Sequence, residues 1–126
     1  MQLYQDFFVF PEDLDLFRVG NSTHPRWNNV RLDEVETYEV NGVLMVRANN
    51  LGVSVYTEDR VKKSGLSGWA WRIKRGAVLP PTLKIWSDED GHGLICPTVD
   101  MPLSKYVSLL EELVVHSVKE FKLEKV

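Results

Sequence analysis

The chain has 126 residues, with 15 lysines and arginines against 18 aspartates and glutamates and a formal net charge of −3. This acidic balance argues against a protein that coats nucleic acid or an anionic membrane, because such proteins need a basic surface to displace counterions. The single cysteine, Cys96, excludes an internal disulfide, and no apolar run approaches the roughly 18 residues of a membrane span.

The length suits one domain, so we expect a single domain over residues 1–126. The first residues lack the basic start and the apolar stretch of a secretory signal. We therefore expect a cytoplasmic protein, and its delivery into a target cell would need a route that cleaves no signal peptide.

Short β-rich runs punctuated by turn residues predict most of the elements. Strands are expected at residues 15–19, 36–40, 43–48, 52–56, 69–74, 83–86 and 92–96. Arg18 is placed at the end of the first strand. A loop rich in Asn, Ser, Thr and Pro follows at residues 21–29. Asn41-Gly42 predicts a tight hairpin, because this dipeptide tolerates two positive φ angles.

Two helices are predicted. Thr57 can cap a short helix that Gly65 stops. The clearest helix begins at Pro102 and carries one apolar stripe at spacings of three and four. The stripe consists of Leu103, Tyr106, Val107, Leu110, Leu113, Val114, Val118 and Phe121. We expect this helix to pack across a sheet as core, and the class to be α+β because no βαβ rhythm recurs.

Several motifs follow one another in a fixed order. They are Leu16-Phe17-Arg18-Val19, Gly52-Val53-Ser54-Val55-Tyr56, Leu79-Pro80-Pro81-Thr82-Leu83-Lys84-Ile85, His92 with Ile95 and Pro97, and Met101-Pro102-Leu103. Together they resemble type VI secretion effector toxins of the ADP-ribosyltransferase-like fold. The resemblance covers roughly the last two thirds of the chain. It implies two small, mostly antiparallel sheets that form a cleft for NAD, with the long C-terminal helix packed on the sheet.

The same resemblance implies a cytotoxic effector that acts in the target-cell cytoplasm by NAD-dependent ADP-ribosyl transfer or by NAD hydrolysis. NAD would be the co-substrate, a macromolecule the acceptor, and a cognate immunity protein or antitoxin would cover the cleft. Arg26-Trp27-Asn28 is also similar to the Arg-Trp-Asn signature of another NAD-degrading toxin group on this fold. Transfer and hydrolysis both stay open, because the sequence does not show which acceptor takes the ribosyl group.

Cleavage of the nicotinamide–ribose bond develops positive charge on the ribose, so a site must grip the dinucleotide and stabilise that charge. Arg18 suits the phosphates, because a guanidinium makes paired hydrogen bonds. Ser54 can bond ribose hydroxyls or orient an acid, and an aromatic ring can face the nicotinamide. His92 is implied by the resemblance. The predicted catalytic residues are Arg18, Ser54 and His92, and the predicted NAD-binding residues are Arg18, Phe17, Ser54 and Tyr56.

The acidic residues of the late strands depart from the family pattern. ADP-ribosyltransferases place a glutamate on a late strand, whereas Asp88, Glu89 and Asp90 fall in a predicted solvated turn at residues 87–91. We expect no metal site there, because a bare acidic run does not provide converging ligands. Cys96 is predicted to be a small buried residue, since a nucleophilic thiol needs an adjacent base and a lowered pKa.

A different class of function is a non-catalytic module that binds a protein or a sugar through exposed tryptophans, which are favoured at binding hot spots. The candidates are Trp27, Trp69, Trp71 and Trp86. Such a module needs these rings in one exposed patch, whereas an enzyme needs Arg18 and Ser54 to face one cavity together with an aromatic ring, for which Trp71 is a further candidate.

Overall fold

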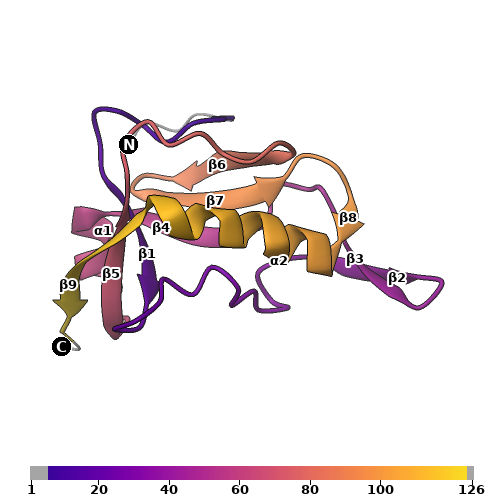
Figure 1. The fold of residues 1–126 in the computed structure, drawn as a ribbon, viewed down its shortest axis with the longest axis horizontal. Coiled ribbons are helices and arrows are strands. Elements are labelled where there is room, and N and C mark those ends of the chain that lie inside the picture. Colours follow the sequence, from indigo (N-terminus) through magenta and orange to yellow (C-terminus); the bar gives the residue numbers. More distant parts are fainter. Residues whose placement is uncertain (1–5, 125–126) are drawn as a thin grey trace.

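The larger of two antiparallel sheets has six strands in the order β6-β7-β4-β1-β5-β9 (Figure 1). The structure, a computed structural model, describes residues 6–124. The six strands are β1 (Leu16–Gly20), β4 (Val53–Thr57), β5 (Gly68–Ile73), β6 (Leu83–Glu89), β7 (His92–Pro97) and β9 (Ser117–Leu123). All of them except β9 coincide with predicted strands, and the α+β class is confirmed.

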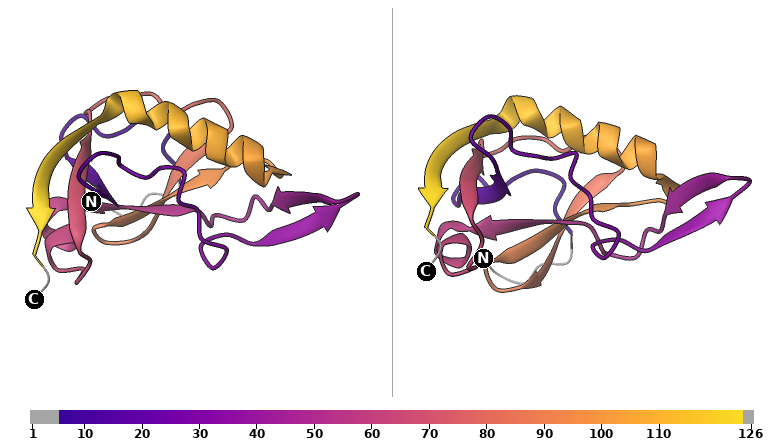
Figure 2. Two further views of the ribbon diagram at one scale, coloured as in Figure 1. Left: turned by 60° about the horizontal axis from the view of Figure 1, so that its bottom comes forward. Right: turned by 90° about the horizontal axis from the view of Figure 1, so that it is seen from below.

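The smaller sheet is built around a hairpin. Its strands are β2 (Thr37–Val40), β3 (Val43–Val46) and β8 (Met101–Pro102), in the order β2-β3-β8. Asn41 and Gly42 have positive φ angles of 50° and 81°, so the predicted tight turn is confirmed. The hairpin projects from the end of the molecule opposite β9 (Figure 2). Asp100 anchors it by accepting hydrogen bonds from the Tyr38 hydroxyl at 2.5 Å and the Ala48 N–H at 2.7 Å.

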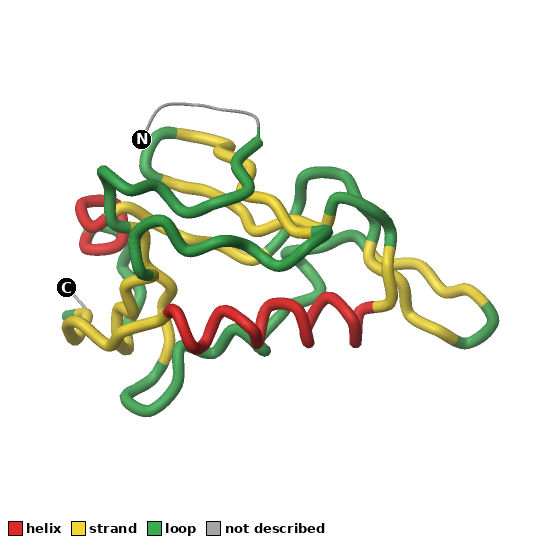
Figure 3. The backbone as a smooth tube through the Cα atoms, turned by 45° about the horizontal axis from the view of Figure 1, so that its top comes forward, coloured by secondary structure: helices red, strands yellow, loops and turns green. Residues whose placement is uncertain are grey.

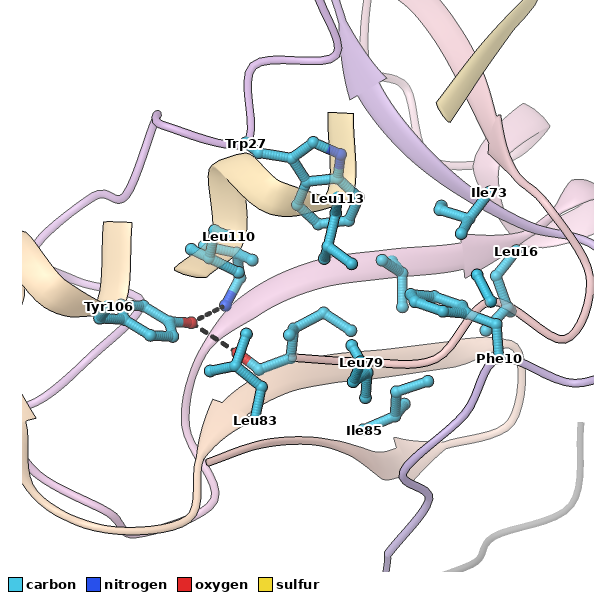
Figure 4. Close-up of a cluster of buried hydrophobic side chains, with 14 of the residues drawn as sticks. Phe10, Leu16, Trp27, Ile73, Leu79, Leu83, Ile85, Tyr106, Leu110 and Leu113 are labelled. Carbon is cyan, nitrogen blue, oxygen red and sulfur yellow. Dashed lines mark hydrogen bonds between the residues drawn. The ribbon is translucent and has the colours of Figure 1, made fainter. Parts of the chain in front are cut away.

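The main helix, α2 (Leu103–Glu111), lies across one face of the larger sheet and continues into a 3-10 helix, η1 (Glu112–His116) (Figure 2). Its apolar side packs into the main core, where Tyr106, Leu110 and Leu113 are fully buried (Figure 4). The Tyr106 hydroxyl accepts the Val53 N–H at 3.1 Å and donates to the Ile95 carbonyl at 2.5 Å. Tyr106 therefore ties the helix to both β4 and β7.

The predicted C-terminal helix is too long, because residues 117–123 form strand β9 against β5. Ala70 pairs with Phe121 and Trp71 with Lys119, so a bulge at Glu120 inserts one extra residue. A bulged strand places two side chains three residues apart on the same face. Val118 and Phe121 thus kept a helical spacing inside a strand, and the spacing alone could not distinguish the two structures.

The short helix α1 (Glu58–Lys62) follows β4 directly, and Thr57 caps it by accepting the Arg60 N–H at 3.4 Å, as predicted. Among residues 6–124, neither helix is both long and apolar enough to cross a membrane.

Candidate active site

The two central strands of the larger sheet part from each other after a short contact. Strands β1 and β4 share the register pairs Leu16–Thr57 and Phe17–Tyr56, whereas β1 pairs with β5 over residues 17–20. Beyond Phe17 the space between the strands is bridged by the Arg18 side chain, whose Nη1 donates to the Ser54 carbonyl at 3.2 Å. A side chain therefore replaces the main-chain ladder at this point.

Arg18 lies in the middle of β1, not at its end as predicted, and its side chain is buried. Its Nη2 donates to the carbonyls of Arg26 at 3.0 Å and Asn29 at 3.2 Å. Its Nε has no hydrogen-bond partner among the described residues. Burial lowers the pKa of the guanidinium, although nearby Glu34 opposes this effect. With both Nη atoms used by carbonyls, Arg18 holds the loop after β1 against β4.

A cavity of about 180 Å³ opens where β1 and β4 part. It is lined by Arg18, Val19, Gly20, Arg26, Asn29, Arg31, Glu34, Ser54, Tyr56, Leu66 and Ser67. Its walls come from the larger sheet, from residues 21–36, which contain no helix or strand (Figure 3), and from Leu66 and Ser67 in the loop before β5. The three-stranded sheet contributes no residue to the lining. The cavity thus lies between strands of one sheet and two of its loops, instead of between two sheets as expected.

Arg26 connects this cavity to a second hollow of about 340 Å³. Both hollows are lined by Arg26 and Asn29, and the second also by Asn21, His24 and Asn28. Arg26 has a φ of 57°, an unusual value for a residue with a side chain, and its N–H donates to His24 Nδ1 at 2.7 Å. The two hollows form one polar surface with several arginines.

Ser54, His92 and Asp88 form a continuous chain of hydrogen bonds beside the cavity. The Ser54 Oγ lies 2.9 Å from His92 Nε2, and His92 Nδ1 lies 2.7 Å from one Asp88 carboxylate oxygen and 2.9 Å from the other. The His92 side chain is 14% exposed and that of Asp88 33%. Ser54 lines the cavity, so the chain of bonds leads from its wall to the outer end of β6.

The strand register brings these three residues together. His92 is the register partner of Tyr56, which puts it diagonally opposite Ser54 on the same face of the sheet. In the β6–β7 hairpin, Ser87 pairs with Gly93 and Glu89 with His92, so Asp88 occupies a bulge. Bulges redirect side chains and are frequent next to active sites. Residues 87–89 therefore belong to β6, and only the end of the predicted acidic turn is a turn.

The predicted aromatic residues have separate environments. Tyr56 lines the cavity, and its ring lies 5.0 Å from the His92 ring. Phe17 is 2% exposed, packs against Phe121 at 5.5 Å and does not line the cavity. The structure therefore places the Phe17 ring in the core beside the cavity, whereas NAD binding by Phe17 remains a prediction. Trp71 on β5 does not line the cavity either, and its indole N–H donates to the Asn21 carbonyl at 2.8 Å.

Sequence reasoning missed several residues that shape the site. Asn29, Arg31 and Glu34 reach the cavity through an irregular loop, and no periodicity predicts such a path. Glu34 accepts hydrogen bonds from the Arg31 N–H at 3.1 Å and Arg31 Nε at 3.3 Å, which orders this wall. Asp88 could have been found, because the Asp90-Gly91 dipeptide predicts a hairpin and thus brings residues 88 and 92 close together.

The acidic hairpin contains ligand types that metals use. One ligand atom each from Asp88, Glu89 and His92 lies within 4.8 Å of the others. Both ring nitrogens of His92 already have protein partners, Asp88 and Ser54. Glu89 is paired with Arg60. These contacts satisfy the side chains without an ion.

The tryptophans do not form the exposed patch that a binding module would need. Trp27 is fully buried, packs among the core residues in Figure 4 and donates to Ser117 Oγ at 2.9 Å. Trp69 and Trp71 on β5 are partly buried, as is Trp86 on β6. Three strands separate β5 from β6 in the sheet order. The tryptophan-based module therefore has no surface to support it.

The fold and the site define an α+β protein of mostly antiparallel strands whose basic cavity opens between two central strands, beside a serine and a histidine. The chain belongs to the Tse2 ADP-ribosyltransferase toxin family, whose model matches residues 7–121. Tse2 is a type VI secretion effector, so the family predicted from the ordered motifs is confirmed. No curated protein and no solved structure matches the chain.

Proposed function

We propose that this chain is a toxin that breaks the bond between nicotinamide and ribose in NAD inside a target cell and passes the ADP-ribosyl group to an acceptor. The observation that carries this proposal is the basic cavity with Ser54 on its wall, backed by the Ser54–His92–Asp88 chain of hydrogen bonds. Membership of an ADP-ribosyltransferase toxin family supports the choice of NAD.

The dinucleotide would occupy both hollows. A cavity of about 180 Å³ suits the nicotinamide riboside end, and the neighbouring hollow of about 340 Å³ suits the adenosine end. Arg26 lines both, so its guanidinium is placed to bond the pyrophosphate between them. Arg18 would contribute the rigid wall that its Nη atoms create.

Ser54 and Tyr56 would act at the reacting end. Both come from β4 and line the cavity, at positions two residues apart on the same face of the strand. In this proposal the Ser54 hydroxyl contacts the ribose, and the Tyr56 ring contacts the nicotinamide. His92 lies behind both and orders them through its hydrogen bond to Ser54 and its ring contact with Tyr56.

Release of nicotinamide from NAD by the purified protein tests this proposal, with Ser54→Ala as the site variant and Ser108→Ala, on the exposed side of α2, as the control. We expect wild type and the control to release nicotinamide and Ser54→Ala to be slower by about 100-fold or more. Release that appears only with cell lysate would indicate transfer to a macromolecule, and release in buffer would indicate hydrolysis. No release in either condition would contradict the proposal.

An immunity protein that fills the cavity would silence such a toxin in the cell that makes it. The arginines on the cavity wall favour a partner that inserts acidic side chains. Hydrogen exchange of the complex with the cognate immunity protein should show protection at residues 18–20 and 26–31. Protection confined to the hairpin at residues 37–46 would contradict occlusion of the cavity.

A further inference from the structure

A chain of carboxylate, imidazole and hydroxyl leads from the β6–β7 hairpin to the wall of the cavity. We propose that Asp88 is a positioning residue that fixes the tautomer of His92 and thereby makes the Ser54 hydroxyl a hydrogen-bond acceptor towards the cavity. The group of NAD that meets Ser54 is then a hydrogen-bond donor, a hydroxyl of the nicotinamide-bearing ribose. The inference deepens the proposed function, and its NAD step rests on that function.

The tautomer of His92 follows from the carboxylate at the outer end of the chain. An ionised carboxylate only accepts hydrogen bonds, so the contact of Asp88 with His92 Nδ1 at 2.7 Å requires the ring proton on Nδ1. In the neutral ring, Nε2 then carries a lone pair and accepts. The hydrogen bond of 2.9 Å between Nε2 and Ser54 Oγ therefore uses the hydroxyl proton of Ser54.

The bond to His92 decides what Ser54 offers to a bound molecule. A serine hydroxyl has one proton and two lone pairs, and it ordinarily rotates to suit a donor or an acceptor. Here its proton is used by Nε2, and Ser54 lines the cavity. Towards the cavity, Ser54 Oγ therefore presents lone pairs and accepts a hydrogen bond, but it has no proton left to donate.

The structure holds the His92 ring from several sides. Both oxygens of the Asp88 carboxylate lie within 2.9 Å of Nδ1, because the bulge in β6 directs this side chain to the ring. The Tyr56 ring packs against the imidazole with 5.0 Å between the ring centroids. A neighbouring carboxylate, Glu89, pairs with Arg60 instead. The His92 side chain is only 14% exposed, so little solvent competes for its two hydrogen bonds.

An acceptor at Ser54 contrasts with the charged groups of the cavity wall. The arginines in the lining are Arg18, Arg26 and Arg31, and a guanidinium accepts no hydrogen bond. Glu34 also lines the cavity, but its carboxylate already accepts hydrogen bonds from the N–H and the Nε of Arg31. The arginines suit the phosphate oxygens of a dinucleotide, and Ser54 suits a sugar hydroxyl. The wall therefore selects a ligand that carries free hydroxyls beside its phosphates.

The ¹⁵N shifts of the His92 imidazole report its tautomer by NMR without NAD. At pH 8 we expect a protonated Nδ1 and an unprotonated Nε2 in the wild type. In Asp88→Ala the two shifts should move towards the average of the two tautomers. Glu89→Ala, which truncates the neighbouring carboxylate in the same way, should keep the wild-type shifts. A proton on Nε2 in the wild type, or the same shifts in wild type and Asp88→Ala, would overturn the proposal.

Binding of carba-NAD tests the donor on the ligand. In this analogue a methylene replaces the ring oxygen of the nicotinamide-bearing ribose, so the bond to nicotinamide stays intact during calorimetry. We expect the wild type to bind either the 2′-deoxy or the 3′-deoxy derivative about 10-fold more weakly than carba-NAD. Ser54→Ala should bind carba-NAD and that derivative equally, and Asp88→Ala should narrow the difference. A derivative with acetyl in place of the carboxamide should bind the wild type as carba-NAD does.

The proposed function and this inference can fail separately. A ring proton on Nδ1 without any binding of carba-NAD would support the fixed tautomer and contradict the NAD function. Release of nicotinamide from NAD, together with equal wild-type affinities for carba-NAD and both deoxy derivatives, would keep the proposed function and overturn the ribose contact. A loss confined to the acetyl derivative would also overturn it, because the donor at Ser54 would then be the carboxamide.

Discussion

Arg18 is a buried cation, and its hydrogen bonds indicate another role than its residue type suggests. Its residue type pointed to phosphate binding, but its Nη atoms donate to the carbonyls of Ser54, Arg26 and Asn29. Burial of a polar group without hydrogen bonds destabilises the fold. The three carbonyls therefore stabilise the buried guanidinium. A motif could predict that Arg18 belongs to the site. It could not predict the contacts, because they depend on where the strands part.

Tyr106 provides a test of how the helix is fixed to the sheet. Tyr106→Phe leaves the Val53 N–H and the Ile95 carbonyl without their shared partner in the core. We expect a loss of about 1–3 kcal/mol in the free energy of unfolding, measured by urea denaturation. Tyr38→Phe is the control, because its exposed hydroxyl partner Asp100 can bond water instead. Equal losses in the two variants would contradict the role assigned to Tyr106.

Cys96 should be chemically silent in the folded protein. Burial raises the pKa of its thiol to about 12, and the thiolate is the reactive form. The raised pKa keeps the thiol neutral at pH 8, whereas an unfolded cysteine, with a pKa of about 8.5, is partly ionised there. We expect no reaction with an aromatic disulfide reagent at pH 8 in the native state and complete reaction in guanidinium. Rapid native labelling would contradict the burial of Cys96.

At the scale of elements, local turns were predictable from the sequence, whereas two β-bulges were not. The hairpin at Asn41-Gly42 was predictable because its turn chemistry is local. The bulge at Glu120 gives Val118 and Phe121 a helical spacing inside β9. The bulge at Asp88 directs its carboxylate toward His92, although the sequence predicted a solvated turn there. Both bulges depend on the partner strand. A single strand's sequence therefore does not reveal them.

Gly52 marks the place where β4 begins close to β7. A Cβ at this position would lie 2.0 Å from the Ile95 carbonyl oxygen and 2.9 Å from the Tyr106 hydroxyl. We expect Gly52→Ala to lower the free energy of unfolding by about 3 kcal/mol or more, because backbone atoms must shift. Gly65→Ala is the control, since its φ of 77° costs only about 1–2 kcal/mol and its Cβ would meet open space. Similar losses of unfolding free energy in the two variants would contradict the close approach of the Gly52 backbone to the Ile95 carbonyl.

At the scale of the whole molecule, the site exists because a continuous sheet is interrupted at its centre. Helix α2 covers one face of the sheet (Figure 2). Residues 26–34 of the loop after β1 line the cavity. Ordered motifs were enough to predict the family. They also singled out Ser54 and His92, which are hydrogen-bonded to each other beside the cavity. They misplaced the cavity between two sheets, because the parting of β1 and β4 arises from long-range pairing and leaves no local signal.

Binding of NAD to this cavity is most directly measured by titrating NAD into ¹⁵N-labelled Ser54→Ala and mapping the amide shifts by NMR. We expect saturable shifts at NAD concentrations up to about 1 mM, largest at residues 18–20, 26–31 and 54–56. Shifts concentrated on the hairpin at residues 37–46, or no saturable shift, would contradict it.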